Sequence, residues 1–180
     1  MQVCVIPGDG IGLEVVGAAV PVLRALAPDA QLVEAEAGWG AFERHGAALP
    51  AATLEAARAA DAILFGAVAS PSHPVPGYRS PIVQLRRELE LYANLRPVVG
   101  ASICNLQSAI CNLVVVRENT EGLYAGRERL EDGGDTAIAE RVITRRASAR
   151  IARAAFELAR ARAARLGRPG RVTVAHKANV

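Results

Sequence analysis

The chain has 180 residues, of which 51% are hydrophobic and 22% charged, and its formal net charge is +3. This length and apolar content suit one large domain or a domain and a half, and charged residues interrupt every apolar run that could span a membrane. The positive charge comes from arginine, since Lys177 is the only lysine. Aromatic residues are not interleaved with the arginines as in proteins that bind single-stranded nucleic acid, so we expect no binding to nucleic acid. Because no apolar run is long enough, we also expect no association with membranes.

The three cysteines, Cys4, Cys104 and Cys111, form no CxxC pair, which argues against a disulfide framework or a zinc site. Two of them belong to a repeated Ile-Cys-Asn-Leu pattern at residues 103–106 and 110–113, for which we have no physical explanation. The chain also begins without the charged and apolar regions of a secretory signal. We therefore expect reduced thiols and a cytoplasmic protein.

Strands and helices are predicted to alternate in the first half of the chain. Residues 3–6 have the pattern of a buried strand, and a glycine-rich turn leads from them into a helix over residues 13–26. This arrangement begins many phosphate-binding units, but the third glycine of GxGxxG would fall on Leu13, so the dinucleotide fingerprint fails. The pattern further predicts strands over 31–36 and 61–68 and helices over 39–45 and 50–60. The alternation predicts an α/β fold with a largely parallel sheet.

The rest of the chain is predicted to begin with a loop. Residues 70–80 contain three prolines and no apolar periodicity, which is typical of a lid or binding loop. A helix over 81–91 and a strand over 93–99 follow. Residues 125–142 indicate a hairpin arm that cannot bury itself and that we expect to pair with another subunit. An amphipathic helix over 144–168 and a strand over 171–176 are predicted to complete the segment.

One stretch concentrates polar groups at the end of a predicted strand. Val114–Val116 form a short apolar run, and Arg-Glu-Asn-Thr-Glu-Gly-Leu-Tyr follows at residues 117–124. Open α/β sheets bind ligands at the carboxyl ends of their strands. Arg117 can bind a carboxylate through two parallel hydrogen bonds, and Tyr124 can donate a proton. The alternative for this pattern alone is a strand followed by a polar turn.

Four stretches together resemble the family of β-decarboxylating 2-hydroxy-acid dehydrogenases, which includes isopropylmalate, isocitrate, homoisocitrate and tartrate dehydrogenases. They are IPGDGIG at residues 6–12, LRR and YANLRP within 85–97, RENTEGLY at 117–124, and AHKANV at 175–180. The resemblance implies an α/β fold, an αβα sandwich of the isopropylmalate dehydrogenase type with a mixed, largely parallel sheet. It further implies two domains, with segments 1–99 and 100–180, and an inter-subunit β-arm. We expect the chain to be the N-terminal part of a longer protein.

The resemblance also implies roles for particular residues. Arg86, Arg96 and Arg117 would bind the carboxylates of the substrate, although a surface ion pair is the ordinary role of such residues. Tyr124 would protonate the enol carbon after CO₂ leaves, and Lys177 would help to remove the hydroxyl proton, as a lysine with a lowered pKa can. Lys177 and Asn179 would reach the active site of a neighbouring subunit, which implies a homodimer or homotetramer. The further expected contacts are Ser72, Val83 and Asn179 at the substrate, and Ile11 and Asn179 at the cofactor.

The same resemblance implies the reaction. NAD would accept the hydride, and Mg²⁺ or Mn²⁺ would be held by ligands beyond residue 180. RENTEGLY is similar to homoisocitrate and NAD-dependent isocitrate enzymes rather than to isopropylmalate enzymes, and Tyr92-Ala93-Asn94 is more similar to homoisocitrate enzymes. Ser80 and Gln84 suit a polar, tricarboxylate-type substrate. We therefore expect oxidative decarboxylation of homoisocitrate to 2-oxoadipate, in lysine biosynthesis through aminoadipate, with isocitrate or 3-isopropylmalate as alternatives. An alternative of another class is a non-catalytic regulatory or binding subunit, which would usually have lost the lysine or the tyrosine.

Overall fold

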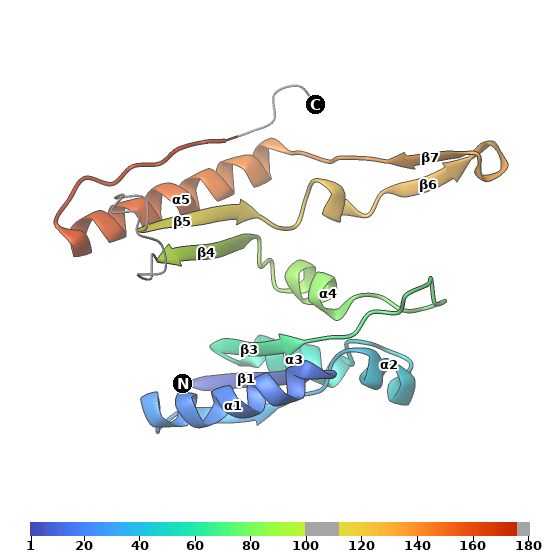
Figure 1. Ribbon diagram of the computed structural model, residues 1–180, viewed down its shortest axis with the longest axis horizontal. Helices are drawn as coiled ribbons and strands as arrows, with labels where there is room; N and C mark the ends of the chain where they lie inside the picture. The colour runs from blue at the N-terminus through green and yellow to red at the C-terminus, as the bar shows by residue number, and fades with distance from the viewer. Residues whose placement is uncertain (100–111, 176–180) are drawn as a thin grey trace, which may run out of the picture. The chain divides into compact units, whose positions relative to one another are not determined.

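The computed structural model describes residues 1–99 and 112–175. The chain divides into two compact units, Met1–Glu90 and Leu91–Val180 (Figure 1). The division lies earlier than the predicted boundary between residues 99 and 100, because strand β4 (Ala93–Val99) pairs along its whole length with β5 (Asn112–Glu118) in the second unit. The cysteine repeat around Cys104 and Cys111 lies outside the described residues.

A parallel sheet forms the centre of the first unit. Its strands are β1 (Gln2–Gly8), β2 (Gln31–Glu34) and β3 (Ala62–Ala67), in the order β2-β1-β3. The middle strand is buried on both faces from residue 3 to residue 6, which explains why its sequence is continuously apolar rather than alternating. These strands confirm the three that the sequence predicts, with ends that differ by a few residues.

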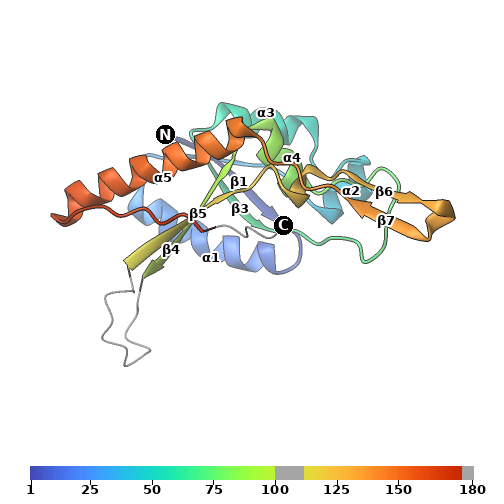
Figure 2. The same cartoon turned by 90° about the horizontal axis from the view of Figure 1, so that it is seen from above.

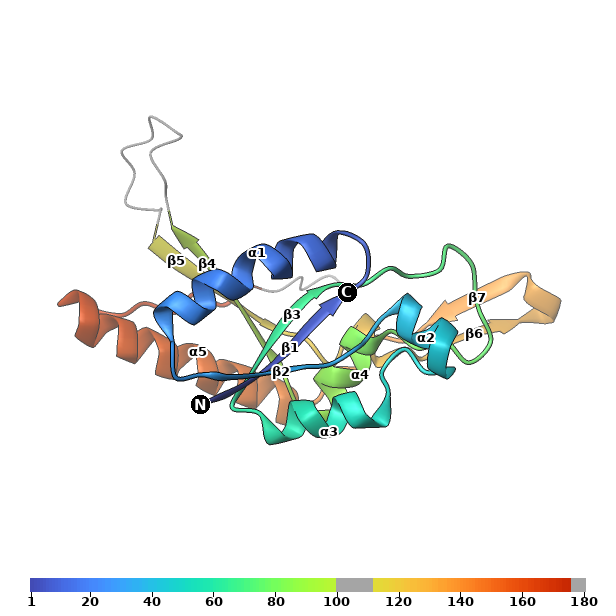
Figure 3. The same ribbon diagram turned by 90° about the horizontal axis from the view of Figure 1, so that it is seen from below.

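Helices cover both faces of this sheet. Helix α1 (Ile11–Leu26) lies on one face, where Val16 packs with Val3 and Val5. Helix α3 (Ala51–Ala59) lies on the opposite face (Figure 3). On that side Cys4 and Ile6 belong to one buried cluster with residues of α3 and of α4 (Pro81–Glu88). A short helix, α2 (Trp39–His45), follows β2 as predicted.

The second unit is built on an antiparallel strand pair and one long helix. Helix α5 (Arg145–Leu166) packs along β5, and Val114 and Val116 on that face are half-buried. The predicted arm is confirmed as a hairpin of β6 (Glu128–Glu131) and β7 (Thr136–Ala139). It extends away from β4, β5 and α5 (Figure 2). Short 3₁₀ turns, Leu123–Ala125 and Asp132–Gly134, precede and close it.

The predicted strand over residues 171–176 is wrong over its described part. Residues 171–175 are in no strand, since they make no ladder with another strand in the part of the chain that the structure describes. A valine-rich run alone does not make a strand, because the backbone groups of a strand need a paired neighbour.

Within residues 1–99 and 112–175, none of the helices has the length and apolar character needed to cross a membrane.

Candidate functional site

The end of β5 places a guanidinium beside polar groups of β4. Arg117 lies directly opposite Asn94 in the antiparallel ladder, and Arg96 lies two residues along β4. Directly opposed residues and residues two apart share a face of a strand pair. Both arginines are exposed on that face, and the Arg96 Nε donates to the Asn94 Oδ1 at 3.1 Å. The sequence prediction that Arg96 and Arg117 act together is therefore compatible with the register.

Tyr124 lies against Arg117. The Arg117 Nη2 donates to the Tyr124 hydroxyl at 2.8 Å, and the guanidinium carbon lies 5.2 Å from the centre of the tyrosine ring. A cation at this distance from a ring is attracted to it. Tyr124 is 41% exposed, so its hydroxyl can reach a ligand bound to the arginines. The structure thus brings together three of the predicted site residues.

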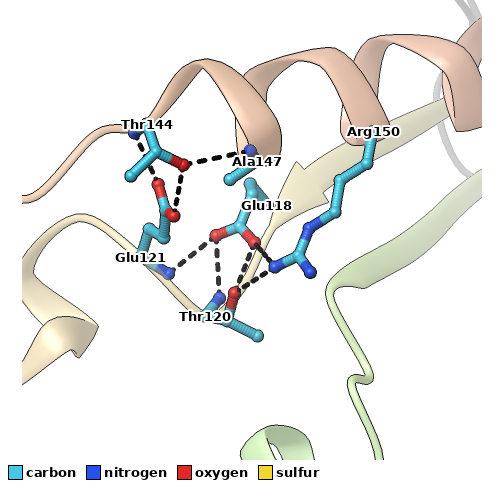
Figure 4. A network of polar contacts seen from close by, with 6 residues as sticks. All are labelled: Glu118, Thr120, Glu121, Thr144, Ala147 and Arg150. Carbon is cyan, nitrogen blue, oxygen red and sulfur yellow. Dashed lines mark hydrogen bonds and ion pairs between the residues drawn. The ribbon is translucent and has the colours of Figure 1, made fainter.

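A network of hydrogen bonds holds the turn between Arg117 and Tyr124 (Figure 4). The Glu118 carboxylate accepts from the backbone amides of Thr120 and Glu121, both at 2.8 Å, and from the Thr120 hydroxyl at 2.6 Å. Arg150, on α5, donates to the Glu118 carboxylate at 3.0 Å and to the Thr120 hydroxyl at 2.6 Å. The guanidinium of Arg150 also lies 4.5 Å from the centre of the Tyr92 ring.

The far side of the turn is fixed to the start of α5. The Glu121 carboxylate accepts from the amide and the hydroxyl of Thr144, at 2.8 and 2.7 Å. Thr144 in turn accepts from the Ala147 amide at 3.1 Å and so caps the helix. Gly122 and Val142 exchange backbone hydrogen bonds at the base of the arm. The path of the chain toward Tyr124 is thus set by contacts with segments distant in sequence.

These contacts change the acidity of Glu118. Its partial burial would raise the pKa of the carboxyl, because burial disfavours the charged form. The hydrogen bonds from the Thr120 hydroxyl, from the Glu121 and Thr120 amides and from Arg150 outweigh the burial, and the pKa of Glu118 lies below its ordinary value. The network is therefore built around an ionised carboxylate.

In the first unit, helix α4 carries the predicted residues Val83 and Arg86. They are three residues apart, so they share a helix face, and both are half-buried, whereas Leu85 is buried in the core. The Gln84 side chain donates to the Arg79 carbonyl at 3.0 Å. Gln84, which the sequence suggested for contact with a polar substrate, therefore makes a local contact at the start of its own helix.

The loop over residues 70–80 is anchored at one aromatic residue. Tyr78 packs against Trp39 and Phe42, with ring centres 5.7 and 5.3 Å away, and its hydroxyl donates to the Ala69 carbonyl at 3.1 Å. Ser72 is exposed, and its hydroxyl lies 3.5 Å from the His73 Nδ1. Tyr78 thus ties the loop to α2 and to the chain just after β3.

The glycine-rich turn after β1 is organised by Asp9. Its carboxylate accepts from the amides of Trp39 at 2.6 Å, Gly40 at 2.9 Å and Ala69 at 3.2 Å. It therefore caps α2 and ties the end of β3 to the turn. The amides of Gly12 and Leu13 donate to carbonyls within the turn and are not free for a phosphate. Ile11, predicted at the cofactor, is the first residue of α1 and is 59% exposed.

Sequence reasoning missed Asp9 and Arg150 as organising residues. Arg150 stands among the many arginines of the chain, and no local pattern separates it from them. Lys177 and Asn179, predicted to reach a neighbouring subunit, lie outside the described residues. Among residues 1–99 and 112–175, no three histidine, cysteine or acidic side chains come together as a metal site.

Comparison with known proteins places these motifs in a family. Residues 2–180 match the model of isocitrate/isopropylmalate dehydrogenase. A homoisocitrate dehydrogenase of Methanocaldococcus jannaschii is 47% identical over 191 aligned residues, which cover 100% of this chain and 53% of the relative. A 3-isopropylmalate/3-methylmalate dehydrogenase of the same organism is 49% identical, with 99% of this chain and 51% of the relative covered. The chain thus spans about half the length of the curated relatives it matches.

A solved structure agrees with the sequence matches. The crystal structure of isocitrate dehydrogenase from Methylococcus capsulatus matches with a TM-score of 0.80 and 41% identity, covering 89% of this chain and 48% of that one. The predicted α/β fold and the resemblance that the four motifs indicated are both confirmed. The chain belongs to the isocitrate/isopropylmalate dehydrogenase family.

Proposed function

We propose that the protein is an NAD-dependent dehydrogenase that oxidises and decarboxylates homoisocitrate. The observation that carries the proposal is the Arg117–Tyr124 pair, in which a carboxylate-binding group and a proton donor are 2.8 Å apart at the end of one strand. Membership of the dehydrogenase family supports the reaction class. Since the chain spans about half of its relatives, the activity is proposed for the protein at its natural length.

The arginines would bind and orient the substrate. Guanidinium groups hold planar carboxylates through two hydrogen bonds and stay charged at neutral pH. Arg96 and Arg117 share a strand face and would bind one end of the substrate. Arg86, on α4, would bind a further carboxylate, with Val83 on the same helix face against the aliphatic part and Ser72 near the carboxylate of the side arm.

Tyr124 and Lys177 would carry the proton transfers. Lys177 would help to take the proton from the substrate hydroxyl as the ketone forms. Tyr124 would deliver a proton to the substrate carbon from which CO₂ has left, a role that requires a donor held against the bound substrate. Lys177 and Asn179 would come from a neighbouring subunit, so a homodimer or homotetramer would be the active form.

The cofactors are proposed from the family resemblance. NAD would accept the hydride, with Ile11 and Asn179 near it, and Mg²⁺ or Mn²⁺ would polarise the ketone when bound. The family resemblance implies that the metal ligands lie beyond residue 180. The proposed steps above therefore rest on the side chains of this chain alone.

The more specific part of the proposal is the choice of one substrate among those of the family. Relatives of similar identity are named for homoisocitrate and for 3-isopropylmalate, so similarity does not separate the two. A methylene difference in a pocket is worth only about 1–3 kcal/mol, so activity on more than one of these acids is expected. The residue types at positions 92–94 and 117–124 favour homoisocitrate as the substrate, with isocitrate second and 3-isopropylmalate third.

The test is a parallel assay of the natural-length protein with NAD and Mg²⁺. Absorbance of NADH is followed with homoisocitrate, isocitrate and 3-isopropylmalate, and the ratio kcat/KM is compared. We expect the highest value for homoisocitrate, loss of activity with EDTA, and recovery with Mg²⁺ or Mn²⁺. A preference for 3-isopropylmalate would reassign the substrate but leave the reaction. Absence of activity with all three acids, with NADP also tried, would overturn the enzyme assignment.

A further inference from the structure

Arg150 stands apart from the other arginines of α5 because its side chain is enclosed. The side chain is 21% exposed, and its partner Glu118 is 19% exposed. One guanidinium nitrogen bridges the Glu118 carboxylate and the Thr120 hydroxyl (Figure 4), and the guanidinium carbon lies over the Tyr92 ring. A surface ion pair contributes little, but an enclosed group with three different contacts constrains the geometry around it.

The contacts of Arg150 converge on the turn that leads to Tyr124. The Asn119 amide donates to the Tyr92 carbonyl at 2.9 Å, so the ring under Arg150 belongs to the segment that holds the start of the turn. The next two amides donate to Glu118, the carboxylate that Arg150 neutralises. Arg150 therefore supports both the carboxylate that accepts these amides and the hydroxyl of the turn.

Arg117 depends on this network less than Tyr124 does. Arg117 lies in the β4–β5 ladder, where its backbone position is fixed opposite Asn94. Tyr124 lies beyond the turn in a 3₁₀ segment with no ladder of its own. We therefore expect a change in the turn to shift the tyrosine relative to Arg117.

We infer that Arg150 is a positioning residue, which holds the turn over residues 118–121 and thereby places the Tyr124 hydroxyl for proton transfer. The role given to Tyr124 rests on the proposed function. The role of Arg150 in holding the turn does not. Lysine should replace Arg150 poorly, because its single ammonium cannot take the place of the bridging nitrogen and also put a cationic group over the Tyr92 ring.

The kinetic test compares charge-conserving variants of the natural-length protein. Arg150→Lys is expected to lower kcat about 10- to 100-fold, because a misplacement of about 1 Å has this effect on a reacting group. KM for the proposed substrate is expected to change less than about threefold, since Arg117 keeps its place. Arg153→Lys, the same change at an exposed position of the same helix, is the control and should match the wild type.

A double-variant cycle separates positioning from general damage. Tyr124→Phe alone is expected to lower kcat about 10²- to 10⁴-fold, as loss of a proton donor does. If Arg150 acts through Tyr124, the variant with both changes should be no slower than Tyr124→Phe, within a factor of about two. Effects that multiply would overturn the inference, because Arg150 would then act elsewhere.

Hydrogen exchange provides a readout without substrate. The amides of Thr120 and Glu121 should exchange faster in Arg150→Lys than in the wild type and in Arg153→Lys, because their acceptor Glu118 loses its support. Unchanged exchange at both amides would overturn the inference. An inactive wild type, or full activity of Tyr124→Phe, would refute the proposed function instead, and the exchange rates would still decide whether Arg150 holds the turn.

Discussion

At the scale of single residues, Glu118 is a charged group in a half-buried place. Burial alone favours its neutral form, yet four hydrogen bonds, two of them from backbone amides, favour its ionised form. Its pKa is therefore lower in the folded protein than in the unfolded chain. The unfolded state then binds more protons at acidic pH, so the free energy of unfolding rises with pH in that range.

This linkage gives a prediction for the pH dependence of stability. The contribution of Glu118 is fully present above its ordinary pKa of 4.5 and is lost as the pH falls through the lower folded value. Glu118→Gln should reduce the free energy of unfolding near neutral pH by about 1–3 kcal/mol, because an amide cannot accept all four bonds. The difference from the wild type should shrink as the pH falls below 4.5.

Urea denaturation of both proteins between neutral and strongly acidic pH measures this difference. Glu157→Gln, the same change at an exposed position of α5, is the control and should give a difference that does not converge in this way. A constant deficit of Glu118→Gln across the whole range would mean that the charge of Glu118 does not matter to stability.

Residues also show where sequence reasoning stops. Arg117 and Tyr124 are close in sequence, and a strand end is a known place for ligand-binding groups, so their proximity could be predicted. The contact of Arg150 with Glu118 joins residues 32 positions apart, and the contact of Asp9 with Gly40 joins residues 31 positions apart. Such contacts depend on the packing of distant elements, and no local pattern predicts which partner either residue binds.

At the scale of elements, the apolar runs and turn residues predicted most strands and helices, because periodicity and chain breaks are local properties. The strand over residues 171–176 failed for a different reason. Whether an extended, valine-rich segment joins a sheet depends on an unpaired edge of a neighbouring strand. The sequence of the segment itself does not show whether such an edge exists. The same reasoning explains the boundary between the units, since β4 belongs with its partner β5 rather than with the helix before it.

The turn after β1 gives a prediction that contrasts two glycines. A Cβ on Gly8 would lie 1.9 Å from the Ala67 carbonyl oxygen of β3, and Gly8 has a φ of +82°. Gly8→Ala should therefore lower the free energy of unfolding by more than about 1–3 kcal/mol, the range for backbone strain alone. Gly17, inside α1, has open space where a Cβ would stand. Gly17→Ala should raise stability by about 0.5–1 kcal/mol, because alanine favours the helix.

Thermal and urea unfolding of the two variants beside the wild type measures both effects. The matched change from glycine to alanine makes each variant the control of the other. If both variants changed the free energy of unfolding equally and in the same direction, the close approach of β1 and β3 would not be what requires glycine at residue 8.

At the scale of the whole molecule, the proposed site is divided among segments that the chain separates. Arg96, Arg117 and Tyr124 belong to the second unit. Lys177 and Asn179 are proposed to come from another copy. The hairpin arm of β6 and β7 is exposed along β6, which suits an element that another subunit covers. In this proposed arrangement, an isolated subunit has every proposed residue but no complete site.

Mixing two inactive variants tests this division directly. In Tyr124→Phe and Lys177→Ala, every site of a homodimer lacks one proposed group. In a mixed dimer, one site would lack both groups and the other would lack neither. Co-expression of differently tagged, natural-length subunits in equal amounts should therefore recover about a quarter of the wild-type kcat, since half of the dimers are mixed and each has one intact site. Purification through both tags should raise the recovered fraction to about half. If Tyr124 and Lys177 instead served the same subunit's site, each site of a mixed dimer would lack one group, and no mixture would be more active than its components.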